Sequence, residues 1–123
     1  MPKIQMPIEL FNKGAVVYID FAYDDDPDKS KKRPAIVIDY NENSTRVIVL
    51  KVTTQGVRSK YDYPLVNPDM ANLKGNSVVR CNHTLTLPNG YKCEKHGDLS
   101  RQDALAVEYL YNQAIYDNEI VQA

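Results

Sequence analysis

Short segments rich in β-branched residues, separated by polar turns, occupy most of the sequence before residue 90. The segment 15–21 alternates, with Val17, Ile19 and Phe21 on one face, which is the pattern of a strand with one buried face. About five strands are predicted, over residues 15–21, 35–39, 46–54, 61–66 and 76–87. Pro64 cannot donate a hydrogen bond to a central ladder, so the fourth segment is expected at the edge of a sheet.

The same alternation assigns side chains to the two faces of each strand. In the segment 46–54 the predicted core face consists of Ile48, Leu50 and Val52. The opposite face then consists of Val47, Val49, Lys51 and Thr53. In the segment 76–87, Arg80, Asn82 and Thr84 are predicted to share one face.

The end of the sequence has a different, helical pattern. Ser100 followed by Asp103 is typical of a helix N-cap with its capping-box acid, and Leu99 with Ala104 is a candidate hydrophobic staple. The predicted helix begins at Arg101 and ends near Tyr116. Its core face consists of Ala104, Val107, Tyr111 and Ala114. The expected fold is therefore mainly β, a small antiparallel sheet or partly closed barrel with a C-terminal helix packed against it.

Length and composition fit one ordinary globular domain. With 123 residues, 43% of them hydrophobic, and a net charge of -1, we expect a single domain over residues 1–123 with one core. Residues 1–12 are predicted to be a lead-in, residues 13–96 the β region and residues 100–117 the helix. No apolar run is long enough to span a bilayer or to form a secretory signal, so a cytoplasmic location and free thiols at Cys81 and Cys93 are expected.

Several kinds of chemistry find no support in the sequence. The acidic run at residues 24–28 lacks the glycine and the glutamate of a calcium loop, and His83 and His96 have no metal ligands at suitable spacing. Neither a nucleotide-binding nor a serine-hydrolase motif is present. No cofactor and no metal are therefore predicted. Either histidine can serve in acid–base chemistry or simply lie hydrogen-bonded at the surface, and the sequence leaves both open.

A basic cluster, Lys31-Lys32-Arg33-Pro34, leads directly into the strand 35–39. The low net charge argues against bulk binding of long nucleic acid, but it allows a local basic groove for a few phosphates. An arginine at the mouth of a central strand is held more rigidly than one on a free loop, and Pro34 stiffens the chain next to it. A surface ion pair is the alternative role for Arg33.

Six short motifs, in this order and spacing, give the sequence its resemblance to a known family. They are Gly14-Ala15-Val16-Val17, Asp20-Phe21, Lys32-Arg33-Pro34-Ala35-Ile36-Val37-Ile38, Val52-Thr53-Thr54-Gln55, Ser77-Val78-Val79-Arg80-Cys81-Asn82 and Gly97-Asp98-Leu99-Ser100. From about residue 13 to residue 116 the chain resembles the PemK/MazF-like toxins of type II toxin–antitoxin systems. The resemblance implies an SH3-like barrel, a homodimer, metal-independent cleavage of single-stranded RNA in the cytoplasm and a cognate antitoxin protein as partner.

The resemblance also implies roles for individual residues. Arg33, Thr53 and Arg80 match catalytic positions of the family, and Lys32, Lys51, Gln55 and Asn82 are the candidate substrate-binding residues. Asn82 stands where the family has an acid, and residues 22–32 lack the histidine that some members use to contact substrate. The identity of the general base is therefore open. Tyr23, Tyr61 and Tyr63 are candidates for stacking on RNA bases.

Three readings of function follow from these residues. The first is an endoribonuclease toxin in which the RNA 2′-OH attacks the adjacent phosphorus, Arg33 stabilises the added charge and Thr53 orients the phosphate. The second is a poison of the same fold that binds a protein such as DNA gyrase. The third, suggested by Asn82, is a homologue whose activity has decayed.

Overall fold

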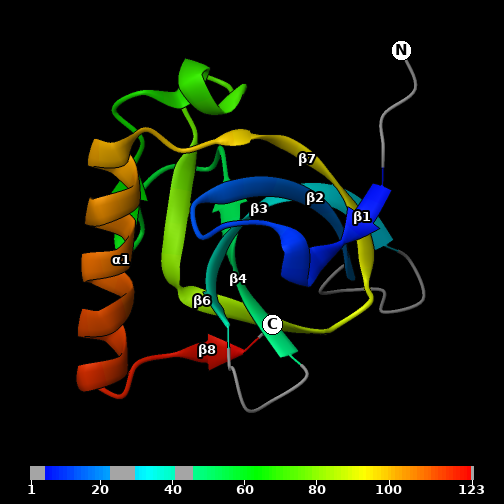
Figure 1. Ribbon diagram of the computed structural model, residues 1–123. Helices are drawn as coiled ribbons and strands as arrows, with labels where there is room; N and C mark the ends of the chain where they lie inside the picture. Colours follow the sequence, from blue (N-terminus) through cyan, green and yellow to red (C-terminus); the bar gives the residue numbers. More distant parts are fainter. Residues whose placement is uncertain (1–4, 23–29, 41–45, 123) are drawn as a thin grey trace.

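In the described part of the chain, eight strands form one open sheet and a single α-helix packs against it (Figure 1). The structure, a computed structural model, describes residues 5–22, 30–40 and 46–122. The elements in chain order are β1 (Gln5–Pro7), the 3-10 turn η1 (Ile8–Leu10), β2 (Ala15–Ala22), β3 (Ser30–Tyr40), β4 (Arg46–Thr53), β5 (Asp62–Pro64), η2 (Pro68–Ala71), β6 (Val78–Pro88), β7 (Lys92–Asp98), α1 (Arg101–Tyr116) and β8 (Val121–Gln122).

The strand order is β1-β7-β2-β3-β4-β6-β5, with β8 attached to β6. All strand pairs are antiparallel except β6 with β8. Within the described chain no pairing joins β1 to β5, so the sheet curls but does not close. The predicted mainly-β fold with a C-terminal helix is confirmed. Strand β5 lies at the edge of the sheet, as expected from Pro64.

The buried residues form two clusters, not the single core expected from the length. The first lies against β1 and η1, and its members are Ile8, Phe11, Ala15, Val17, Ile19, Ala35, Val37, Val47, Val49, Leu87 and Cys93. The second lies against α1, and its members are Val16, Ile36, Ile38, Leu50, Val52, Leu65, Ala71, Val79, Cys81, Leu99, Val107 and Tyr111. Within the segment predicted as a lead-in, Ile8 is completely buried and so forms part of the first cluster.

The helix begins and ends as the sequence predicts. Ser100 is the N-cap, and its Oγ accepts a 3.1 Å hydrogen bond from the backbone N–H of Asp103. The Asp103 carboxylate is fully buried and accepts bonds from two backbone N–H groups, those of Val66 and Asn67, and from the hydroxyl of Tyr63. This capping acid therefore ties the segment after β5 to the first turn of α1.

Two strands differ from their predicted form, with consequences for the candidate residues. β3 starts at Ser30, so Arg33 lies inside a strand, opposite Ile19 of β2, and not on a loop at the mouth of a strand. In the pairing of β4 with β6, Leu50 faces Thr84 but Lys51 faces Arg80. This irregularity breaks the predicted alternation, and three consecutive side chains, Arg80, Cys81 and Asn82, are all buried. Tyr23 and the acidic run at 24–28 lie outside the described residues.

Candidate functional site

Strands β2, β3, β4 and β7 and the segment after η2 surround a groove of about 430 Å³. Its lining residues are Tyr18, Lys31, Lys32, Arg33, Pro34, Val52, Thr53, Thr54, Asn72, Leu73, Lys74, Ser77 and His96. Three predicted site residues, Lys32, Arg33 and Thr53, lie here together. The strand register explains this, because Ala35 pairs with Lys51 and the same antiparallel register brings Arg33 level with Thr53.

The electrostatics of this groove favour a negatively charged ligand. Four of the lining residues are cationic, namely Lys31, Lys32, Arg33 and Lys74. Among the described residues that line it, none is acidic, although the whole chain carries a net charge of -1. Arg33 is partly exposed and forms no ion pair with any residue that the structure describes. Its guanidinium is therefore available to bind two oxygens of a phosphate.

Thr53 has a more enclosed position at the end of β4. It is 6% exposed, and its Oγ1 accepts a 3.2 Å hydrogen bond from the backbone N–H of Gln55. This bond leaves the hydroxyl proton of Thr53 available as a donor to a ligand in the groove.

The groove also contains a cluster of residues that the sequence patterns did not place at the site. The rings of Tyr18 and His96 meet edge to face, with centroids 4.6 Å apart. His96 Nε2 contacts the backbone oxygen of Asn72, and the Asn72 side-chain amide donates a 2.9 Å bond to the backbone oxygen of His96. His96 was a candidate for acid–base chemistry, but only the fold shows that it shares a groove with Arg33 and Thr53.

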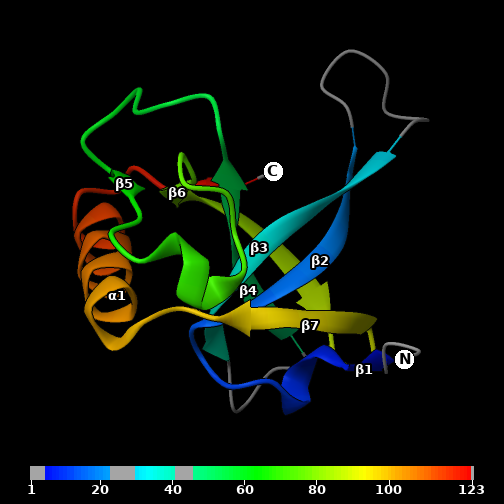
Figure 2. The ribbon, with the colours of Figure 1, turned by 90° about the horizontal axis from the view of Figure 1, so that it is seen from above.

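Two backbone features position His96. Val16 pairs with Gly97 and Val17 with Lys95, so His96 is the extra residue of a β-bulge in β7. A bulge redirects side chains locally and is common beside active sites. Next to it, β7 and η2 are in backbone contact (Figure 2), and a Cβ atom at Gly97 would lie only 2.6 Å from the backbone oxygen of Ala71. Glycine is therefore required at this position for the close approach.

Four predicted site residues lie outside the groove. Arg80 is buried and its Nη1 lies 3.3 Å from Oδ2 of Asp62. Asn82 is buried beneath the end of the chain, where its Nδ2 donates a 3.1 Å bond to the backbone oxygen of Glu119. Lys51 lies opposite Arg80 in the sheet, and the exposed Gln55 follows β4. The structure therefore brings Arg33, Thr53 and Lys32 together but not these four.

Tyr61 and Tyr63, the two candidates for stacking on RNA bases that the structure describes, form hydrogen bonds away from the groove. The hydroxyl of Tyr61 donates a 2.6 Å bond to Asp117, and that of Tyr63 donates a 2.7 Å bond to Asp103. Neither ring lines the groove.

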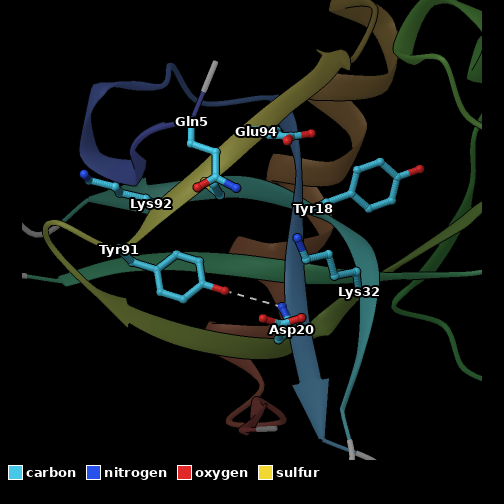
Figure 3. Close-up of a pocket in the computed structure, with 8 residues that line it drawn as sticks. Gln5, Tyr18, Asp20, Lys32, Tyr91, Lys92 and Glu94 are labelled. Atoms are coloured by element: carbon cyan, nitrogen blue, oxygen red, sulfur yellow. Dashed lines mark hydrogen bonds between the residues drawn. The ribbon is translucent and has the colours of Figure 1, made fainter. Parts of the chain in front are cut away.

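A second pocket, of about 470 Å³, adjoins the first and shares Tyr18 and Lys32 with it (Figure 3). Its lining residues are Gln5, Tyr18, Asp20, Lys32, Tyr91, Lys92, Cys93 and Glu94. The hydroxyl of Tyr91 accepts a 3.4 Å hydrogen bond from the backbone N–H of Asp20. In Figure 3 the ring of Tyr91 lies across β2 from Tyr18, so each pocket has an aromatic side chain.

Other kinds of site find little support in the described structure. Burial raises the pKa of the Cys81 thiol to about 12 and that of Cys93 to about 11, so neither is a reactive thiolate at neutral pH. No group of three or more His, Cys, Asp or Glu side chains suited to a metal ion occurs among residues 5–22, 30–40 and 46–122. None of the helical segments described is long and apolar enough to cross a membrane.

Comparisons with known proteins place the chain in a family. The sequence model of the "PemK-like, MazF-like toxin of type II toxin-antitoxin system" matches residues 12–113. No curated protein matches the sequence.

Solved structures agree on the fold. MazF in a MazE-MazF crystal structure from Deinococcus radiodurans superposes with a TM-score of 0.67 at 18% identity, over 87% of this chain and 96% of that one. An endoribonuclease in complex with its cognate antitoxin, from a mycobacterial species, gives a TM-score of 0.64 at 16% identity, over 85% and 93% of the two chains. Because the family match covers most of the sequence and the fold agrees with it, this chain belongs to the PemK-like, MazF-like toxins of type II toxin–antitoxin systems.

Proposed function

We propose that this toxin is an endoribonuclease that cleaves single-stranded RNA in the groove formed by β2, β3, β4 and β7. The observation that carries the proposal is the grouping of four cations with the Thr53 hydroxyl in one groove, where no acid occurs among the described lining residues, although the chain as a whole is slightly acidic. A phosphodiester fits this environment, since cationic donors stabilise the charge that its oxygens gain during cleavage.

The proposed reaction uses a nucleophile that the substrate itself provides. The 2′-OH loses its proton and attacks the adjacent phosphorus, the bond from phosphorus to the 5′-oxygen breaks, and the 5′-oxygen takes up a proton. The products are a 2′,3′-cyclic phosphate and a 5′-OH, and no metal-bound water is required. Arg33 binds the phosphate oxygens, while the Thr53 hydroxyl orients one of them.

Binding of neighbouring nucleotides is proposed along the two adjoining pockets. Tyr18 and Tyr91 provide faces or edges for unpaired bases, and Lys32, which both pockets share, contacts the backbone. Roles for Lys51, Gln55, Arg80 and Asn82 in contacting RNA remain predictions, because each would require RNA to reach a residue outside this groove.

Two protein partners belong to the proposal. The Deinococcus MazF and the mycobacterial endoribonuclease were each solved with an antitoxin, which supports a cognate antitoxin for this chain as well. We also propose a homodimer in the cytoplasm, since a net charge of -1 opposes self-association only weakly. Sedimentation at tens of micromolar tests the dimer, and an active monomer would contradict it.

The activity is tested by incubating the purified protein with RNA in EDTA and analysing the ends of the fragments. The expected fragments carry 5′-OH and 2′,3′-cyclic phosphate ends, and a matched RNA with a 2′-deoxy sugar at the cleaved position stays intact. Intact RNA with inhibition of DNA gyrase would favour a protein-binding poison. Intact RNA with no toxicity in cells would favour a decayed homologue.

A further inference from the structure

Among the described residues, the imidazole of His96 is held by an edge-to-face contact with the Tyr18 ring and by contacts to one of its two ring nitrogens. Nε2 contacts the backbone oxygen of Asn72 and lies 3.5 Å from the hydroxyl oxygen of Tyr18. A carbonyl oxygen can only accept a hydrogen bond, so Nε2 carries the proton. In the neutral ring the lone pair that can take up a proton is then on Nδ1, which has no partner within the described part of the chain.

The group that fixes this tautomer is itself firmly held. Asn72 adopts the left-handed conformation, with φ of 57°, at the end of η2, and its backbone N–H bonds back to Asp69. Its side chain bonds to the backbone of His96, and the contact of Gly97 with Ala71 fixes β7 against η2. An oriented base of this kind, in which a second group holds the proton on the far nitrogen, is the arrangement used by histidines in acid–base catalysis.

We infer that His96 is the general base of the RNA cleavage, an inference that rests on the proposed function. Nδ1 of His96 takes the proton from the 2′-OH as the new bond from the 2′-oxygen to phosphorus forms. The 5′-oxygen leaves with the electron pair of the broken bond and takes a proton from water in the open groove. The imidazolium then returns its proton to solvent.

This assignment names a general base, whose identity the sequence does not determine. The sequence has no histidine in residues 22–32 and has Asn82 in place of the family acid. In the fold, His96 comes from β7 at the far end of the chain and lines the groove with Arg33 and Thr53.

The test compares single-turnover cleavage by wild type, His96→Ala, His96→Gln and the matched control His83→Ala. General-base catalysis contributes about 10²–10⁴-fold, so both His96 variants should lose roughly that much. Glutamine keeps a donor for the Asn72 oxygen but has no base, so it separates catalysis from folding, which urea unfolding checks. His83 lies on β6 outside the groove, and its variant should cleave at the wild-type rate.

Two further measurements test whether His96 removes the proton from the 2′-OH or instead protonates the leaving 5′-oxygen. Added imidazole should restore part of the rate to His96→Ala and none to Arg33→Ala. An RNA whose leaving 5′-oxygen is replaced by sulfur needs no acid, so it should not rescue His96→Ala. Wild-type rates in both His96 variants, or rescue by the sulfur substrate, would overturn the assignment while leaving the proposed endoribonuclease standing. An inactive wild type would overturn both.

Discussion

Arg80 and Asp62 form an ion pair inside the protein, with Nη1 3.3 Å from Oδ2 and with only 9% and 1% of their side chains exposed. The two residues are direct partners in the pairing of β5 with β6, and Oδ2 of Asp62 also accepts a 2.8 Å bond from the backbone N–H of Arg58. The guanidinium of Arg80 is therefore engaged in joining the edge strand to the sheet.

We expect Arg80→Ala to reduce the free energy of unfolding by about 3–5 kcal/mol, because it leaves the Asp62 carboxylate buried without its partner. The double variant Arg80→Ala/Asp62→Ala should recover part of this loss, which urea unfolding measures. Full stability of Arg80→Ala combined with loss of RNA cleavage would instead support the catalytic role that the family resemblance implies.

Arg33→Ala should lower RNA cleavage by about 10²–10³-fold, since it removes a preorganised charge from the phosphate site. Arg33 forms no ion pair among the described residues, so the free energy of unfolding should change by less than about 0.5 kcal/mol. Arg46→Ala is the matched control, because Arg46 is exposed at the start of β4, away from the groove. Wild-type cleavage by folded Arg33→Ala would remove Arg33 from the site.

Thr53→Val preserves the shape of the side chain but removes its hydroxyl. A hydrogen bond to a charged group contributes about 1.5–3 kcal/mol, so cleavage should fall about 10- to 150-fold. Thr54→Val, at an exposed position in the same groove, should have little effect. Equal rates for the two variants in a single-turnover assay would contradict the role of Thr53.

Asn82→Asp tests whether this copy has decayed. An aspartate cannot donate the bond that Asn82 makes to the Glu119 backbone, and it buries a charge there. We therefore expect reduced stability near the chain end, measured by hydrogen exchange, with unchanged or lower RNA cleavage. Thr53→Ala should damage cleavage more than Asn82→Ala. A strong gain of activity in Asn82→Asp over an inactive wild type would show a decayed toxin.

Stability should decline at alkaline pH. Burial, followed by the hydrogen bond to Asp103, raises the pKa of Tyr63 to about 12, and burial raises that of Cys81 to about 12. A raised pKa in the folded state means that folding favours the protonated form, so this stabilisation is complete below the unfolded values, near 9 for cysteine and 10 for tyrosine. It is lost as the pH rises toward 12.

The urea midpoint between pH 7 and pH 11 measures this decline. Tyr63→Phe should be less stable than wild type at pH 7, because the bond to Asp103 is lost, but its stability should fall less steeply with pH. Tyr116→Phe, at a position 86% exposed, is the control and should follow the wild type. An identical slope in Tyr63→Phe would show that Tyr63 does not titrate with unfolding.

The sequence alone was sufficient for features that depend on neighbours along the chain. The helix from Arg101 to Tyr116 and its Ser100 cap were predictable because capping and helical periodicity involve residues within a few positions of one another. The edge position of β5 followed from Pro64, which has no N–H to donate. The family resemblance singled out Arg33 and Thr53, and the register of β3 with β4 brings them together.

Features that depend on distant contacts were decided only by the tertiary structure. Alternation placed Val49 on the face of β4 opposite Ile48, Leu50 and Val52, but residues of β1 and η1 complete the first cluster over that face, so both faces of β4 are buried. Because β6 pairs irregularly with β4, the three successive residues Arg80, Cys81 and Asn82 are all buried, which no strict two-residue period predicts. The bulge that directs His96 depends on how β7 pairs with β2, some 80 residues earlier in the sequence. The burial of a strand and the position of a bulge depend on the strands and segments that pack against it. These are distant in the sequence, so a local residue pattern cannot predict them.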